Sequence, residues 1–285
     1  MPDIHSATDT ETTLTDQVIA RIRPDADERV HQVMTALIRH VHGFVKEVEL
    51  TPAEWEKGVA FLSELGNWCN EKRQEVILLS DILGVSMLVD AIAHRHHNPE
   101  VTESTVLGPF HRMGAPHVEN GADISGGIAG EPLDVRVTVT DPAGTPIEGV
   151  QVDVWHTSPD GLYDSQFGDE HALRGVFRTD AAGLVAFTSI MPSAYPVPHD
   201  GPVGQVLAGM GRGPMRPAHV HFWLRREGYR PLVTQVFAAG DAYLADDAVF
   251  GVKASLIHDY RAEAAAAGQP GHKLSWTFVL PPEQV

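Results

Sequence analysis

The chain has 285 residues, of which 43% are hydrophobic and 21% charged, as in ordinary globular proteins. Its net charge of −17 argues against nucleic acid or an anionic membrane as partner, because both attract basic surfaces. The single cysteine, Cys69, excludes an intrachain disulfide and a thiolate metal cluster. The polar opening does not resemble a secretory signal, and no apolar run reaches membrane-spanning length, so we expect a cytoplasmic protein.

The first hundred residues carry helical signals. Residues 1–16 are polar and threonine-rich and are predicted to be a frayed lead-in. Apolar positions at helical spacing predict an amphipathic helix over residues 25–48. The sequence TPAE at residues 51–54 predicts the start of a helix that ends near Cys69. Residues 71–92 are apolar on more than one face, which predicts a third helix that is buried or covered by another subunit.

From about residue 100 onward, β-branched and aromatic residues alternate with polar ones, and turns become frequent. This pattern predicts short strands at residues 133–139, 150–156, 176–179, 184–190, 219–224, 232–237 and 274–280. We therefore expect an α+β protein, with a helical domain over residues 1–100 and an antiparallel β-sandwich over residues 101–285. The alanine-rich residues 262–267 are predicted to be helical.

The connection between Ile190 and Ala218 is unusually long and rich in proline and glycine. A loop of this length inside a compact domain is usually functional, and its apolar content indicates that it packs. It carries Tyr195 and ends at Arg216, directly before a strand that contains His219 and His221.

The two histidines of that strand are the first candidate metal ligands. Residues i and i+2 of a strand share a face, so both imidazoles project from the same side, and together they make half of a metal site. The alternative is that one or both are core histidines with satisfied N–H groups. Tyr163 and Tyr195 could complete the site, because phenolate is a hard anionic donor that suits ferric iron better than zinc. Each tyrosine taken alone is more often a half-buried aromatic residue.

Three segments together resemble the intradiol ring-cleavage dioxygenases, the catechol 1,2-dioxygenases and their relatives. They are DVWHTSPDGLYD at residues 153–164, PSAYPVP at residues 192–198 and RPAHVH at residues 216–221. The helical N-terminal region resembles the dimerisation segment of that family. The sequences KRQEVILLSDILG at residues 72–84 and TVLGPF at residues 105–110 are most similar to the hydroxyquinol 1,2-dioxygenase branch.

The resemblance implies one non-haem Fe(III) per chain. Its equatorial ligands would be Tyr163 and His219, and its axial ligands Tyr195 and His221. Arg216 matches an arginine beside the substrate ring, and Gln235 matches a pocket glutamine, so both join Tyr195 as catalytic candidates. The remaining residues that the resemblance places around the ring are Leu78, Asp81, Val106, Leu107, Gly108, Phe110, Val197 and Pro198.

The implied reaction is the cleavage of hydroxyquinol (benzene-1,2,4-triol) by dioxygen to 3-hydroxy-cis,cis-muconate, or maleylacetate, in the degradation of aromatic compounds. Catechol and chlorocatechol are alternative substrates. The resemblance also implies a homodimer formed through the N-terminal helices, with phospholipid bound at the interface. Asp81 is expected to accept a hydrogen bond from the third hydroxyl of the substrate, or else to pair locally.

Two hypotheses lie outside this class. One is a non-catalytic β-sandwich binding module in which the histidines are structural. The other is a zinc hydrolase that uses His219 and His221 with a carboxylate, although no HExxH motif occurs in the sequence.

The metal distinguishes these hypotheses. We expect one iron per chain and a wine-red concentrated protein, because tyrosinate donates charge to Fe(III) in the visible range. Metal analysis and an absorption spectrum of the purified protein check this. Stoichiometric zinc with no visible band would contradict the iron hypothesis.

Overall fold

The computed structural model describes residues 7–70, 73–95, 100–168, 171–264 and 270–283. By its internal contacts the chain separates into two compact units, Met1–Ser63 and Glu64–Val285, and each is described by itself. The domain boundary expected at residue 100 rests on the change in amino-acid composition there. Internal contacts place the division earlier in the chain, because they group the helices after Glu64 with the sheets.

The first unit contains helix α1 (Ala7–Ile19), helix α2 (Glu28–Glu47) and most of α3 (Pro52–Asn67). The predicted helices at 25–48 and from Thr51 are confirmed, and Thr51 and Glu54 form the expected reciprocal cap. The prediction of a frayed lead-in is wrong for residues 7–16, while residues 1–6 lie outside the described residues. Helix α1 is stabilised by contact with α2, including a 3.0 Å hydrogen bond between Thr15 Oγ1 and His42 Nδ1.

The second unit begins with two short helices where one was expected over residues 71–92. Helix α4 (Glu75–Ile82) and helix α5 (Val85–His94) meet at a bend of 71°, and residues 71–72 lie outside the described residues. The bend occurs at Gly84, whose φ of +72° is left-handed and ends an α-helix. Within the described ranges no single helix is long and apolar enough to span a membrane, and only the bent pair reaches that length and composition.

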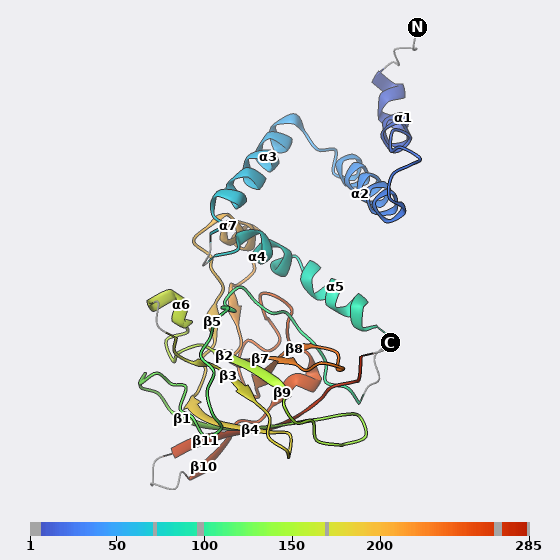
Figure 1. Cartoon of the computed structure of the whole chain (residues 1–285). Helices are drawn as coiled ribbons and strands as arrows, with labels where there is room; N and C mark the ends of the chain where they lie inside the picture. The colour runs from blue at the N-terminus through green and yellow to red at the C-terminus, as the bar shows by residue number, and fades with distance from the viewer. Residues whose placement is uncertain (1–6, 71–72, 96–99, 169–170, 265–269, 284–285) are drawn as a thin grey trace. The chain divides into compact units, whose positions relative to one another are not determined.

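Two sheets follow, with strand orders β10-β11-β1-β4 and β3-β2-β7-β8-β9. Most neighbouring strands are antiparallel, as expected, but β1 pairs with β11 and β8 with β9 in parallel, so the sandwich is mixed. In Figure 1 the first sheet lies below the second. The strands are β1 (Pro132–Thr140), β2 (Gln151–His156), β3 (Arg174–Arg178), β4 (Leu184–Ile190), β7 (His219–Arg225), β8 (Leu232–Ala238), β9 (Ile257–His258), β10 (Arg261–Ala264) and β11 (Pro270–Val279).

The main core fills the space between the two sheets. Alternate residues of each strand point inward, as the two-residue period of a strand requires. Phe222 on β7 meets Phe278 on β11 at 4.9 Å between ring centroids, and Phe177 on β3 stacks on Phe187 on β4 at 4.8 Å. These contacts join the sheets and leave the opposite face of β7 available for polar residues.

Two connections differ from expectation. The segment between Ile190 and Ala218 contains helix α7 (Pro202–Gly209) and a small two-stranded pair, β5 (Tyr195–Pro196) and β6 (Met215–Arg216). The predicted helix at residues 262–267 is wrong for 262–264, because backbone pairing of β10 with β11 outweighs the helix propensity of alanine. Residues 265–267 lie outside the described residues. The remaining short helices are α6 (Asp164–Phe167) and η1 (Ala254–Leu256).

Candidate metal centre

Strand β7 carries both candidate histidines on the face that turns away from the sandwich core. Val220, Phe222 and Leu224 point into the core, so His219 and His221 point outward, yet both are buried. Their Nε2 atoms lie 3.0 Å apart. His219 Nδ1 lies 2.7 Å from the carbonyl oxygen of Pro217 and must donate to it, which leaves the lone pair of His219 on Nε2. A ring held in this way is prepared for a cation.

The two tyrosines reach the same point from separate segments. Tyr163 follows a turn at Gly161 and places its hydroxyl oxygen 3.0 Å from His221 Nε2. Tyr195 lies on β5, opposite Arg216 on β6, and its ring meets that of Tyr163 edge-on at 5.2 Å. A Cβ at Gly161 would lie 3.1 Å from the carbonyl oxygen of Ala194 and from Tyr195 Cβ, so glycine permits the close approach of the two segments.

The donor set fits a ferric ion. Burial raises the pKa of Tyr163 well above its ordinary value, and the adjacent Tyr195 adds to the effect. A phenolate at this position therefore requires a neighbouring cation. Burial, followed by the charge of Arg216, lowers the pKa of His219 to about 3, so the imidazole is neutral and able to bind metal. Two phenolate oxygens and two imidazole nitrogens form a hard, anionic set.

Other donors are scarce around the histidines. Within the part of the chain that the structure describes, no three or more His, Cys, Asp and Glu residues gather in a way that could hold a metal. A metal at His219 and His221 would therefore take its further ligands from the tyrosines that lie beside them. The His219, His221 and carboxylate arrangement of the zinc hypothesis is not formed by these described residues.

Aromatic rings fix the planes of the candidate ligands. Trp155 lies opposite His221 in the pairing of β2 with β7 and stacks on its ring at 4.6 Å and 11°. Phe110 stacks on Tyr163 at 4.4 Å and 15°. Gly108 passes so close that a Cβ there would lie 3.3 Å from His221 Cε1. Phe110 and Gly108 were expected around the substrate ring. Trp155 belongs to the motif at residues 153–164, but no role of its own was expected for it.

Arg216 is buried beside this cluster and carries a stable charge. Burial alone would lower its pKa, but the charge and hydrogen bond of the Asp247 carboxylate outweigh burial and raise the pKa above the ordinary value. Its NH1 atom lies 3.4 Å from the Tyr195 oxygen, and its NH2 atom donates to Gln235 Oε1 at 2.7 Å. Arg216 is therefore the local positive charge that a protein of net charge −17 needs in order to hold an anionic ligand.

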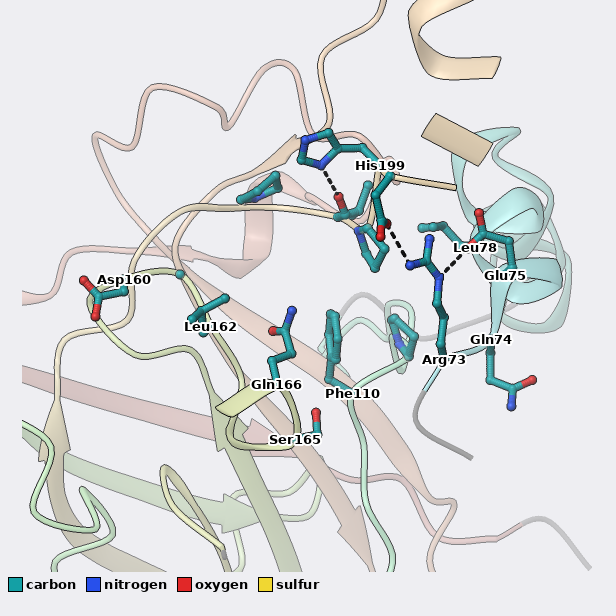
Figure 2. Close-up of a pocket in the computed structure, with 16 residues that line it drawn as sticks. Arg73, Gln74, Glu75, Leu78, Phe110, Asp160, Leu162, Ser165, Gln166 and His199 are labelled. Carbon is teal, nitrogen blue, oxygen red and sulfur yellow. Dashed lines mark hydrogen bonds and ion pairs between the residues drawn. The ribbon is translucent and has the colours of Figure 1, made fainter. Parts of the chain in front are cut away.

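A cavity of about 430 Å³ is lined by Phe110, Leu162 and Pro196, of which the last two adjoin Tyr163 and Tyr195 in the chain. Its lining includes none of the four candidate ligands and not Arg216. In Figure 2 Arg73, Glu75 and Leu78 stand on one side of it, and Leu162 and Gln166 on the other. Four of the expected ring-pocket residues are among those that line it, namely Leu78, Phe110, Val197 and Pro198. The other expected residues, Asp81, Val106, Leu107 and Gly108, are not part of its lining.

Asp81 is buried on α4 and lies within electrostatic range of Arg216. Burial raises the pKa of Asp81 more than a hydrogen bond from Ser86 and the charge of Arg216 lower it. Both expectations for Asp81, a local pairing and a role with substrate, stay predictions. Val106 uses its carbonyl oxygen to accept a hydrogen bond from Gln235 Nε2 at 2.7 Å.

The structure adds residues that sequence reasoning missed. Asp247 binds Arg216 from an irregular segment between β8 and η1, and no motif or periodicity marks it. Arg73 lines the cavity and pairs with Glu75 at 2.8 Å and with Asp200 at 2.7 Å. Glu75 lies in the motif at residues 72–84, and Asp200 lies in the connection between Ile190 and Ala218. The sequence marked both segments, but only the fold brings Arg73 between them.

Comparison with known proteins agrees with this geometry. A family model described as dioxygenase matches residues 106–282, and one described as catechol dioxygenase N terminus matches residues 27–100. The chain belongs to the intradiol ring-cleavage dioxygenases.

Individual relatives point in the same direction. The hydroxyquinol 1,2-dioxygenase of Nocardioides simplex is 47% identical over 92% of this chain and 89% of its own length. The crystal structure of hydroxyquinol 1,2-dioxygenase from Pseudomonas putida DLL-E4 superposes with a TM-score of 0.88 at 42% identity, covering 97% of this chain and 100% of that one. Catechol 1,2-dioxygenase from Pseudomonas arvilla C-1 gives 0.84 at 30% identity, covering 99% and 94%.

Neutral buried histidines make the stability of the metal-free protein depend on pH. Burial lowers the pKa of His156 to about 4 and that of His219 to about 3, from an ordinary value of 6.5. Below pH 6.5 the unfolded chain binds protons that the folded chain does not, so the free energy of unfolding falls as the pH falls from 6.5 towards 3. Each histidine contributes a slope of up to about 1.4 kcal/mol per pH unit.

Urea unfolding of the metal-free protein between about pH 7 and pH 4.5 measures this slope. His156→Gln should reduce this slope, because it removes one buried histidine whose pKa is lowered on folding. The side chain of His156 contacts Ser189 and Thr157 rather than the tyrosines, so the candidate ligands keep their contacts. His31→Gln, at an exposed position on α2, is the matched control. An unfolding free energy that is constant over this range would contradict the prediction.

Proposed function

We propose that this chain cleaves hydroxyquinol between its adjacent hydroxyl groups with dioxygen, using one ferric iron held by Tyr163, Tyr195, His219 and His221. The observation that carries the proposal is the meeting of two phenol oxygens and two imidazole nitrogens at one buried point. The identity of 47% to a hydroxyquinol 1,2-dioxygenase, against 37% to the catechol 1,2-dioxygenase of Candida albicans, favours hydroxyquinol over catechol.

A ferric ion held by Tyr163, Tyr195, His219 and His221 would supply the Lewis acidity that activates a ring diol towards dioxygen. The protein supplies the proton acceptor when the diol binds. Tyr195 is suited to act as this proton acceptor, because it lies on a two-residue strand between proline-rich turns and is less tightly held. Tyr163, in contrast, is fixed between Phe110 and a turn. The Tyr195 oxygen can take a proton from the incoming diol while Arg216 NH1 stays beside it.

Arg216 and Gln235 would then serve the bound ring. The guanidinium is buried, charged and already oriented, so it can stabilise negative charge that develops on the ring without reorganising. Gln235 holds one edge of the guanidinium and is itself held by the carbonyl oxygen of Val106. Leu78, Phe110, Val197 and Pro198 line the neighbouring cavity, and they would supply apolar walls for a ring that reaches the candidate ligands from it.

Asp81 is the proposed partner of the third hydroxyl group. A carboxyl group that is 2% exposed among the apolar residues of α4 is costly unless it has hydrogen-bond partners, and a carboxylate can accept several hydrogen bonds. Catechol lacks the third hydroxyl and would leave that capacity unused. Chlorocatechol would place a substituent there that cannot donate.

The ratio of kcat/KM for hydroxyquinol over catechol, measured by dioxygen uptake, tests the substrate and Asp81 together. We expect a ratio well above one in the wild type and a fall of about 10- to 100-fold in Asp81→Asn, from the loss of a charged hydrogen bond worth roughly 1.5–3 kcal/mol. Glu56→Gln, at an exposed position on α3, is the control. An unchanged ratio removes Asp81 from recognition, and a wild type that prefers catechol overturns the proposed substrate.

We also propose a cytoplasmic homodimer with phospholipid at its interface. Supporting the interface, α4 and α5 expose Val76, Ile77, Leu88, Val89 and Ile92, and a large exposed apolar surface usually marks a contact with another chain. Leu88→Glu should weaken the dimer, because it would bury a charge. Sedimentation at micromolar concentration measures the mass, and a wild-type mass of one chain would contradict the dimer.

A further inference from the structure

Asp247 is bound to Arg216 through two parallel hydrogen bonds. Arg216 Nε lies 2.9 Å from Asp247 Oδ1, and NH2 lies 3.2 Å from Oδ2. The two side chains are only 2% and 3% exposed. Burial acts to raise the pKa of Asp247, but the charge of Arg216 outweighs it and lowers the pKa below the ordinary value. The pair is therefore ionised and held in the fork geometry in which arginine is most directional.

This contact determines which edge of Arg216 faces the metal centre. Asp247 takes Nε and one side of NH2, and Gln235 accepts from NH2 at 2.7 Å. Only NH1 is left, and it lies 3.4 Å from the Tyr195 oxygen and 3.3 Å from His219 Nε2. A metal on His219 Nε2 would occupy the lone pair that accepts from NH1, which would leave the Tyr195 oxygen as the neighbour towards which NH1 donates.

Asp247 is in turn fixed by the backbone around it. Its Oδ2 accepts from the amide of Gly251 at 2.9 Å, and its Oδ1 accepts from the amide of Val249 at 3.3 Å. Thr105 Oγ1 donates to the carbonyl oxygen of Gly251 at 2.7 Å. A Cβ at Gly251 would lie 2.8 Å from Arg216 NH2 and 3.2 Å from Asp247 Oδ2, so the backbone closes directly over the ion pair.

Stability alone is a weak reason for such a pair. The desolvation of two buried charges largely cancels their attraction, and apolar side chains of similar volume are often as stabilising. What the pair provides, and apolar packing would not, is one orientation of a planar, charged group. A guanidinium that must meet a reacting ring needs that orientation before the substrate arrives.

We propose that Asp247 is a positioning residue for the ring-cleavage reaction, which directs Arg216 NH1 towards the Tyr195 oxygen and the bound ring. The assignment rests on the proposed function of this site. It predicts that Asp247 affects turnover through Arg216, and that it affects neither the retention of iron nor the initial binding of the diol.

The first test is Asp247→Asn, which keeps the size of the side chain and removes its charge. Turnover per bound iron with hydroxyquinol should fall at least about tenfold, because NH1 loses its fixed direction. Iron content, the visible absorption band and the affinity for hydroxyquinol titrated under nitrogen should stay within about threefold of the wild type. Asp246→Asn, at the exposed neighbouring position, should behave as the wild type.

Gly251→Ala is a second variant that keeps every charge. The new methyl group would displace the guanidinium from Asp247, so turnover per iron should fall in the same way, again with an unchanged absorption band. Gly213→Ala is its control, because a Cβ there meets no atom within 4 Å. If Asp247→Asn folds poorly, Gly251→Ala tests the positioning role of Asp247 in its place.

Three results would overturn the assignment. The first is wild-type turnover per iron in either variant. The second is a loss of iron or of the absorption band that accounts for the whole fall in activity, since that would make Asp247 a purely structural residue. The third is a wild-type protein that consumes no dioxygen with any ring diol, which would contradict the proposed function itself and is seen without any variant.

Discussion

Strand β7 is buried on both faces, and the rest of the second unit is built around that constraint. An antiparallel sheet commonly has one face in water, but here His219 and His221 on the outer face are as buried as Phe222 on the inner one. Polar atoms in such a place must find partners. His219 obtains one from Pro217, while His221 Nδ1 has no hydrogen-bond partner among the residues that the structure describes. The covering layer includes the segment before Phe110, where Gly108 lies against His221, and this segment is held to the neighbouring strand β8 by the contact between Gln235 and Val106.

Buried ion pairs anchor the segments that bring chemistry to this strand. Arg216 is held by Asp247, as described above. Next to Tyr163 the carboxylate of Asp164 accepts from Arg174 Nε at 2.7 Å, and Arg174 NH2 also donates to the carbonyl oxygen of Phe110 at 3.1 Å. One arginine thus ties the Tyr163 turn to the aromatic ring that stacks on it. Removing one partner of such a pair leaves a buried charge uncompensated, so each pair holds its segment in a single arrangement.

The cavity depends on a third ionic contact, between the start of α4 and the start of α7. Glu75 Oε1 accepts from the amide of Val203 at 3.1 Å, and Arg73 bridges Glu75 and Asp200. This contact joins the helix that carries Leu78 to the segment that carries Val197, and both residues line the cavity. Charged groups in the lining therefore hold these two apolar parts of it together.

Local patterns in the sequence were sufficient for much of this protein. Alternation identified β7 and the neighbouring strands, with His219 and His221 on one face, and the sequence at Thr51 marked a helix start. These signals depend on residues that are close in sequence, where spacing alone determines which side chains share a face. That Tyr163 and Tyr195 join the histidines in a common site was implied by the resemblance of their motifs to the intradiol dioxygenases. By itself the sequence therefore determined the class of fold, the family and the candidate ligands.

Only the tertiary structure decided the rest. Residues 262–264 are strand because β11 offers them backbone partners, and the threonine-rich residues 7–16 are helix because α2 packs against them. Asp247 joins the site from 31 residues beyond Arg216, and Trp155 stacks on His221 across a strand pairing. No local pattern encodes contacts of this kind. They arise because the folded chain must pair every buried charge and backbone group, and the partner is whichever residue the topology brings within reach.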